Sequence, residues 1–208
     1  MNYELLNNNV VTISGVVVST PEYSHHMYGE GFYESKIAVS RLSEQIDEIP
    51  FTISERLLDS SGLEMGKSIT LTGQMRSYNK IIDGKSKLLL TLFVRDVLEE
   101  PISKNPNIID IAGYVCKPPI YRTTPFKREI CDILLAVNRA YNKSDYLPCI
   151  AWGRNARFIK DMDVGAKIKI NGRIQSREYQ KLLEDGEVLS KIAYEISINR
   201  IELDETED

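Results

Sequence analysis

Two tyrosines, the tryptophan and four arginines gather between residues 144 and 181 of this 208-residue chain. They are Tyr146, Trp152, Tyr179, Arg154, Arg157, Arg173 and Arg177. Unpaired bases stack on flat aromatic rings, and guanidinium groups pair with phosphates. Residues of these types in one stretch are therefore typical of a surface that holds single-stranded nucleic acid.

The local pattern predicts two strands that position these side chains. One strand begins at Tyr146 and ends at Trp152, and a short basic helical segment follows at residues 153–160. The second strand covers residues 167–179. Alternate residues of a strand point to the same face, so the two aromatics of the first strand, six residues apart, share a face. The two arginines of the second strand, four residues apart, share one as well.

Neighbouring residues extend this candidate site. The residues predicted to stack on bases are Tyr141, Tyr146, Trp152 and Tyr179. The residues predicted to contact phosphates are Arg122, Lys127, Arg128, Arg139, Lys143, Arg154, Arg157, Arg173, Arg177 and Lys181. A single ring can equally belong to a core, and a single arginine can be a solvated charge. The prediction therefore rests on the cluster and not on any one member.

Charge is distributed unevenly along the chain. The net charge of −4 argues against a nucleic-acid binder unless the basic residues are segregated. Residues 1–104 hold 10 Lys and Arg against 14 Asp and Glu. Residues 105–201 hold 16 against 11, a net charge of +5, and five more acids follow at 202–208. The second half is thus the basic part, with an acidic tail.

The two halves repeat each other at a spacing of 98 to 99 residues. The matching segments, in order, are 10–15 with 108–113, 36–41 with 134–139, 47–51 with 145–149, and 65–73 with 164–172. Four matches in order indicate two copies of one domain, joined by a segment that contains Pro101 and Pro106. The predicted domains are a first copy at 1–100, a second copy at 107–201 and the acidic tail at 202–208.

Each copy is predicted to contain five strands, with one short helix between the third and the fourth. In the first copy, Ser54 is expected to cap the helix and Gly62 to end it. This order of elements is that of an OB-fold barrel, so the predicted fold class is all-β with two tandem OB-fold barrels. Glycines inside the long strands are expected at bulges and sharp bends, at Gly15, Gly73, Gly113 and Gly172.

Several function classes find no support in the sequence. The motifs GxxxxGK[ST], GxSxG and HExxH do not occur, so we expect no enzyme and no cofactor. His25 and His26 are the only histidines and no CxxC spacing occurs, so no metal site is expected. Cys116, Cys131 and Cys149 are expected to be buried free thiols in a reducing cytoplasm. No apolar run is long enough to span a membrane, and no secretion signal is expected.

Six stretches of the second copy carry a family resemblance. They are Gly113–Val115, Tyr121–Pro125, Leu134–Arg139, Asp145–Ala156, Val164–Gly165 and Gly172–Tyr179. Through them, residues 107–201 resemble the bacterial single-stranded DNA-binding protein (Ssb) family. The resemblance implies OB-fold oligomers that coat single-stranded DNA in replication, recombination and repair. It also implies that the stacking aromatics of the family fall on Tyr141, Tyr146, Trp152 and Tyr179.

The first copy lacks these residues. At the positions of Tyr141, Tyr146, Trp152, Arg173, Arg177 and Tyr179 it carries Ser43, Glu48, Ser54, Gln74, Tyr78 and Lys80. We therefore expect the first copy to act as a pseudo-protomer for assembly. Its remaining candidates for contacts to nucleic acid are Arg76, Tyr78, Lys80, Lys85 and Lys87. Its aromatic loop at residues 26–33 is expected to pack internally or to meet a partner.

Together these patterns predict a non-enzymatic single-stranded DNA-binding protein of the cytoplasm, associated with the nucleoid. Relatives with one barrel form tetramers, so a homodimer of this chain is expected, because two chains supply four barrels. Replication or repair proteins are expected as further partners. The alternative is a protein–protein adaptor of the replication machinery, such as a primosome-type accessory factor, which the acidic first copy favours.

Overall fold

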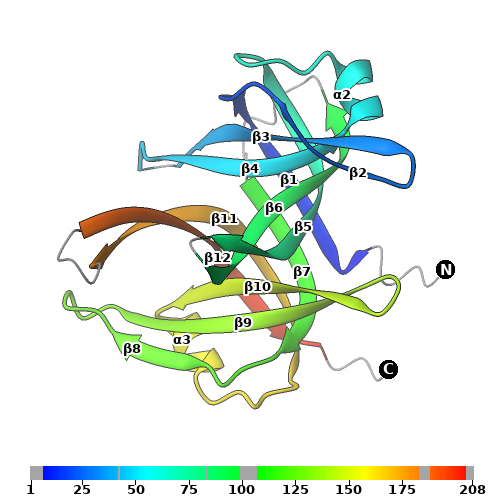
Figure 1. Cartoon of the computed structure of the whole chain (residues 1–208). Helices are drawn as coiled ribbons and strands as arrows, with labels where there is room; N and C mark the ends of the chain where they lie inside the picture. The colour runs from blue at the N-terminus through cyan, green and yellow to red at the C-terminus, as the bar shows by residue number, and fades with distance from the viewer. Residues whose placement is uncertain (1–6, 42, 83, 99–106, 183–187, 205–208) are drawn as a thin grey trace.

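The computed structural model describes residues 7–41, 43–82, 84–98, 107–182 and 188–204, which form two stacked β-structures (Figure 1). The elements of the first are β1 (Asn9–Val17), β2 (Glu22–Met27), β3 (Glu30–Ser40), β4 (Ile46–Ser54), α2 (Glu55–Ser61), β5 (Ser68–Ile82) and β6 (Lys85–Leu98). Those of the second are β7 (Asn107–Val115), β8 (Ile120–Thr123), β9 (Glu129–Arg139), β10 (Lys143–Trp152), α3 (Arg154–Ile159), β11 (Lys167–Leu182) and β12 (Val188–Leu203).

Strand pairing closes each half into a barrel. In the first half the ring runs β1–β3–β4–β6–β5 and returns to β1, with β4 and β6 parallel. The second half closes in the same way as β7–β9–β10–β12–β11, with β10 and β12 parallel. The prediction of an all-β fold with two tandem OB-fold barrels is confirmed. Each barrel carries one additional short strand, β2 or β8, which pairs only with its neighbour along the chain.

Alternating apolar residues fill the barrels. Phe51 and Leu71 are fully buried in the first, as are Leu135 and Leu147 in the second. Side chains on the opposite face of the same strands stay outside, which is the pattern expected of a sheet with one buried face. The sequence does not predict β2 and β8, because their residues are exposed throughout and show no alternation of buried and exposed side chains.

The helices occupy the position predicted for them, between the third and fourth strands of each ring. The Ser54 side chain accepts a hydrogen bond from the Leu57 backbone N–H at 3.4 Å, and Gly62 ends α2 in the left-handed conformation, so both caps of α2 are confirmed. Helix α3 begins after Gly153, which has a φ of 52°, and has no side-chain cap. It buries Ala156 and Ile159 against the second barrel.

Glycines mark the bulges that bend the long strands. The pairing of β5 with β6 shifts register at Gly73, and that of β11 with β12 shifts at Gly172. A Cβ atom at Gly73 would lie 2.1 Å from the Phe93 carbonyl oxygen, and one at Gly172 would lie 2.4 Å from that of Ser197. Any larger residue would push the strands apart, so the expectation for these positions is confirmed.

The cysteines are partly as expected. Cys131 and Cys149 are buried, whereas Cys116 is half-buried, and none of the three is in a disulfide. Burial, together with Asp132, raises the pKa of the Cys131 thiol to about 11. Because the thiolate is the reactive form, Cys131 is inert near neutral pH.

One strand pair joins the two barrels. β1 pairs antiparallel with β7, and Val11 lies opposite Ile109, its own equivalent in the repeat. Residues on either side of that pair are matched symmetrically, so the barrels are related by an approximate two-fold axis at this point. The pairing continues the sheet of one barrel into that of the other, and Figure 1 shows β1 and β7 running side by side between them.

A pair of buried aspartates ties the barrels together away from that axis. Asp47 of β4 accepts hydrogen bonds at its Oδ1 atom from the Ser176 backbone N–H at 2.7 Å and from the Ser176 hydroxyl at 2.8 Å. Arg41 donates to the Asp47 Oδ2 atom at 2.6 Å and to the Ser176 carbonyl at 2.7 Å. On the opposite side, Asp145 of β10 accepts from the Ser77 backbone N–H at 2.8 Å. Each barrel thus places one aspartate against a serine of the other.

The stability of the structure should depend on the ionisation of Asp47. Burial alone would raise the pKa of this carboxyl, but hydrogen bonds from Arg41 and Ser176 outweigh burial and hold the pKa below its ordinary value of 3.8. The carboxylate therefore contributes stability above the unfolded-state pKa, and this contribution is lost as the pH falls through the lower folded-state pKa. We expect Asp47→Asn to reduce the free energy of unfolding at pH 7 by about 2 kcal/mol.

Denaturant unfolding measured from pH 7 down to the acid range would check this. The wild type should lose stability more steeply than Asp47→Asn below pH 4, so the two curves should converge. Parallel curves would show that Asp47 does not couple ionisation to folding.

Candidate nucleic-acid interface

The outer face of β10 carries two of the predicted stacking residues. Tyr146 is 45% exposed and Trp152 is 39% exposed, whereas Leu147 and the other alternate residues of the strand point into the barrel. Small and aliphatic partners lie opposite the rings on β9, since Tyr146 pairs with Ala136 and Trp152 with Ile130. Both rings therefore present open faces on one side of the strand.

The arginine-bearing strand continues the same surface. β10 pairs with β12 at Ile150 and Ser197, and Ser197 in turn pairs with Arg173 of β11. Because paired residues of neighbouring strands lie on the same face, the row of Tyr146 and Trp152 runs on across β12 to the Arg173 row. We call this outer surface of β8, β9, β10, β12 and β11 the second-barrel face.

Tyr179 and Arg177 lie near the outer end of β11. The Arg177 guanidinium carbon is 5.9 Å from the centre of the Tyr179 ring, a cation–π distance. Both residues are exposed, with Tyr179 at 39%. The structure thus combines one ring and one guanidinium group at a single point of the face, as the sequence predicted by composition.

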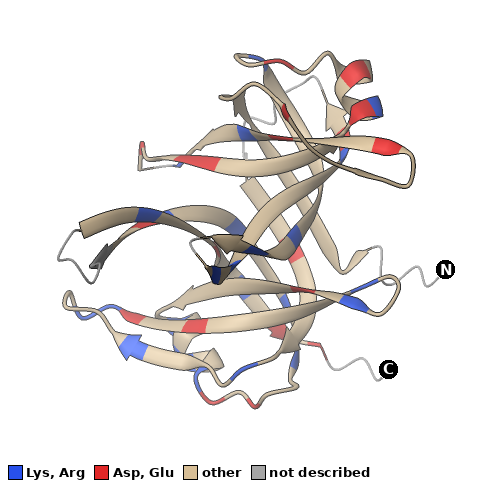
Figure 2. Cartoon of the chain, in the orientation of Figure 1, with Lys and Arg blue, Asp and Glu red and all other residues tan. Residues whose placement is uncertain are grey.

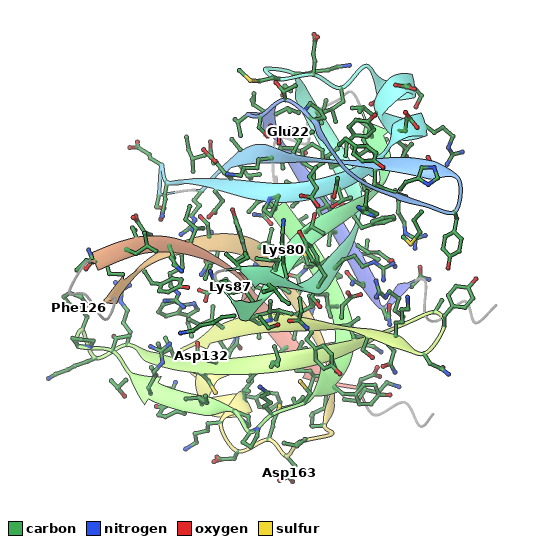
Figure 3. All side chains as sticks on the ribbon, viewed as in Figure 1. Glu22, Lys80, Lys87, Phe126, Asp132 and Asp163 are labelled. Carbon is green, nitrogen blue, oxygen red and sulfur yellow. The ribbon has the colours of Figure 1, made fainter. Side chains whose placement is uncertain are left out.

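Carboxylates alternate with several of the predicted phosphate contacts. Arg122 of β8 donates to the Asp132 carboxylate of β9 at 2.6 Å, and Arg157 of α3 pairs with Glu129. The Arg177 Nε atom lies 3.4 Å from Glu195, whose other oxygen accepts from Gln175 at 2.9 Å. Figure 2 shows acidic and basic segments side by side on β8 and β9, and Figure 3 labels Asp132 and, at the turn before β9, Phe126.

The remaining candidates are spread around this face. Lys127 and Arg128 are exposed in the β8–β9 turn, and Lys143 is exposed at the start of β10. Tyr141 is 92% exposed in the β9–β10 turn, where it has a φ of 64°, and Figure 1 places this turn at the opposite end of the barrel from the β8–β9 turn. The side chain of Lys181 lies outside the described residues.

Two predicted phosphate contacts have other surroundings. Arg139 is engaged between the barrels, with its Nε atom 3.6 Å from the buried Asp145 carboxylate. Arg154 lines a shallow pocket with Phe158 and Arg200, beside α3. Strand pairing therefore places Tyr146, Trp152, Arg173, Arg177 and Tyr179 on the same outer side of the second barrel, where the linking residues Ile150 and Ser197 are buried, and leaves these two at its edges.

The second barrel is similar in sequence to known proteins. Residues 106–204 match the model of the single-strand binding protein family. The second barrel is therefore the part of the chain that is similar to that family. Single-stranded DNA-binding protein 1 of Staphylococcus aureus (strain COL) is 31% identical over 81 residues, which cover 36% of this chain and 48% of that protein. The single-stranded DNA-binding protein of Clostridium tetani is 32% identical, over 36% of this chain and 56% of that protein. The chain thus spans about half the length of the curated relatives it matches.

Solved structures extend the likeness in fold to both barrels. The wild-type single-stranded DNA binding protein from Thermus aquaticus matches 96% of this chain and 94% of its own, with a TM-score of 0.70 and 19% identity. The N-terminal domain of PriB protein from Thermoanaerobacter tencongensis is 43% identical over 46% of this chain and 100% of its own. Its TM-score of 0.40 is too low to indicate a shared arrangement.

The first barrel presents a different surface at the equivalent place. Ser54, which replaces Trp152, is buried and caps α2, and Glu48, which replaces Tyr146, lies 3.4 Å from Lys36. Beside Ser54 the outer face is covered by its own rings, because Phe32 stacks on His25 with ring centres 5.1 Å apart and also contacts Phe93. This internal packing agrees with the first of the two roles expected for the loop at residues 26–33.

Arg76, a candidate of the first barrel for contacts to nucleic acid, already has other partners in the structure. Arg76 lies 5.7 Å from the Phe93 ring centre and donates to the Asp145 carboxylate of the second barrel at 3.1 Å. Nothing in the sequence signals this long-range pair. The other candidates lie on the β5–β6 hairpin, where Tyr78, Lys80 and Lys85 are exposed and Lys87 is half-buried.

In the described parts of the chain, no group of three or more His, Cys, Asp or Glu side chains is placed to hold a metal ion. None of the described helices is long and apolar enough to cross a membrane.

The carboxylates on the second-barrel face should weaken the binding of a nucleic-acid strand. Asp132→Asn frees Arg122 for a phosphate, so we expect tighter binding of oligo-dT at low salt and a salt slope steeper by about 0.7. Fluorescence titrations at several salt concentrations would measure both quantities.

Asp161→Asn is the matched control, since Asp161 is an exposed carboxylate 3.7 Å from Lys160, at the end of α3. An equal gain from both substitutions would indicate a general effect of net charge and would contradict a specific role for the Arg122–Asp132 pair.

Proposed function

We propose that this protein binds single-stranded DNA on the second-barrel face, and that it coats and protects such DNA in replication, recombination and repair. The observation that carries the proposal is the open row of Tyr146 and Trp152, flanked by Arg173, Arg177 and Tyr179, on a domain of the single-strand binding protein family. The named relatives are single-stranded DNA-binding proteins, which supports the same substrate.

Stacking supplies most of the expected affinity. Each base that stacks on an aromatic side chain contributes about 1–3 kcal/mol, and every base has a face to stack, so binding depends little on sequence. Guanidinium and ammonium groups near the rings then hold the phosphates. This mechanism needs no cofactor and includes no chemical step, so we propose a binding protein and not an enzyme, in the cytoplasm at the nucleoid.

The two barrels have different roles in this proposal. The second domain, 107–201, is the main DNA-binding unit, and the first, 1–100, is a pseudo-protomer whose face is partly covered by its own rings. The acidic tail, 202–208, starts at the end of β12, where Asp204 lies 3.0 Å from Lys169. Replication or repair proteins are proposed as further partners.

An adaptor of the replication machinery is the second candidate function. The observation that favours it is the first barrel, which has lost the stacking residues and keeps Tyr23, Met27 and Tyr28 exposed on its β2–β3 hairpin. A native gel separates the two functions, because a DNA-binding protein shifts oligo-dT at low salt and an adaptor without a DNA site does not.

Trp152 provides a direct test of the DNA-binding face. It is the only tryptophan of the chain, so its fluorescence should be quenched when oligo-dT binds. Trp152→Ala should weaken binding by about fivefold or more, since one stacked base is worth about 1–3 kcal/mol.

Phe158→Ala is the control, because Phe158 is 47% exposed on α3 but does not lie on the face. Unchanged fluorescence on DNA addition, together with equal affinities for the two variants, would contradict the placement of the DNA.

The assembly is proposed to be a homodimer with four barrels. Multi-angle light scattering of the full chain should give twice the mass of one chain, with and without oligo-dT. A mass equal to one chain at micromolar concentration would contradict this, and would leave the two barrels of a single chain as the complete binding unit.

A further inference from the structure

Ser77 of the first barrel contacts the backbone of a proposed stacking residue of the second. Its hydroxyl oxygen accepts a hydrogen bond from the Tyr146 backbone N–H at 2.7 Å. Its own backbone N–H donates to the Asp145 carboxylate at 2.8 Å. Two consecutive residues of β10 are therefore held by a single residue of β5, which lies 68 positions or more away in the sequence.

The second barrel cannot make this contact by itself. β9 covers one edge of β10 along its whole length, but β12 covers the other edge only around Cys149 and Ile150. At Tyr146 that edge lies beyond the pairing with β12, and Ser77 takes the place of a strand partner. The ring of Tyr146 has only the small Ala136 opposite it on β9, so its position depends on how its backbone is held.

Charged groups reinforce the contact from both barrels. Asp145 is 1% exposed and also accepts from Arg76 at 3.1 Å, while Arg139 lies 3.6 Å from the same oxygen. A buried carboxylate with several donors has little freedom to move, because each displacement breaks a charge-assisted hydrogen bond. The Ser77 hydroxyl thus sits on a fixed support directly beside Tyr146.

We propose that Ser77 is a positioning residue for DNA binding, through which the first barrel holds Tyr146 in the orientation that stacks on a base. The inference rests on the proposed function and assigns the first barrel a direct part in it. The first barrel contributes no ring of its own to the second-barrel face, yet it sets the geometry of one ring there.

The repeat supplies an internal comparison for this role. Ser176 is the equivalent of Ser77 and meets Asp47 in the same way, but its hydroxyl donates to that carboxylate at 2.8 Å and contacts no stacking residue. The residue after Asp47 is Glu48, not an aromatic. Ser176→Ala therefore removes an equivalent hydroxyl from the contact between the barrels without touching Tyr146.

The experiment compares Ser77→Ala and Ser176→Ala in the full-length protein, by titration with oligo-dT and by thermal unfolding. Both variants should show similar small losses in melting temperature. Ser77→Ala should weaken oligo-dT binding by about two- to tenfold, the range expected for one hydrogen bond, and Ser176→Ala by less than twofold. Equal effects on binding, or no effect of Ser77→Ala, would overturn the proposal.

A double-mutant cycle separates positioning from general destabilisation. In a Tyr146→Ala background, Ser77→Ala should cause no further loss of affinity, because the ring that it positions is gone. A further loss of the same size would overturn the proposal. Wild-type protein that does not bind oligo-dT at low salt would overturn the proposed function itself, and the role of Ser77 with it.

Hydrogen exchange tests the contact without DNA. The Tyr146 amide should exchange slowly in the wild type and in Ser176→Ala, and faster in Ser77→Ala. Equal protection in all three proteins would show that Ser77 does not hold the Tyr146 backbone.

Discussion

The antiparallel pairing of β1 with β7 is the constraint on which the rest of the structure depends. Because Val11 meets its own equivalent Ile109, the two barrels must face each other across an approximate two-fold axis. That arrangement brings Asp47 and Asp145 each against a serine of the other barrel. A buried carboxylate is costly unless several donors surround it, so these contacts form only when the register of β1 and β7 is correct. The strand pair therefore brings the two barrels face to face, and the aspartate contacts stabilise one particular orientation between them.

Within this frame, the interior and the outer face of each barrel have separate requirements. The glycines at the bulges and the alternating apolar residues occur in both copies because closing a small barrel demands them. Barrel closure does not fix which residues lie on the outer faces, and the two copies differ there. Trp152 is an exposed ring in the second barrel, while Ser54 at the same place caps a helix in the first. Phe32 is buried beside His25 and Phe93, and the buried Ser54 stands where the second barrel has its exposed tryptophan.

The sequence predicts those features that depend on local pattern. Alternation and the repeat predict the two barrels, Ser54 and Gly62 mark the ends of α2, and the spacing of Tyr146 and Trp152 places both on one face. Contacts between distant charged residues follow no local pattern. Arg76 and Asp145 are 69 residues apart, and neither residue type nor spacing indicates that they meet. Arg139 is predicted from the sequence to contact a phosphate for the same reason, because the sequence does not show that it faces Asp145 between the barrels.

Charge on the second-barrel face bears on how a chain with a net charge of −4 can hold a polyanion. Arg122 and Arg177 each have a carboxylate partner on the face itself, at 2.6 Å and 3.4 Å. A phosphate must compete with these partners, so each such arginine contributes less than an unpaired one. Ring faces have no competitor of this kind, because Tyr146 and Trp152 lie open in the protein alone. In the proposed function, stacking then dominates the affinity, and a duplex, whose bases are already stacked on each other, should gain little from the same surface. On this proposal the carboxylates should favour single strands over duplexes, because they limit the purely electrostatic attraction that both forms of DNA share.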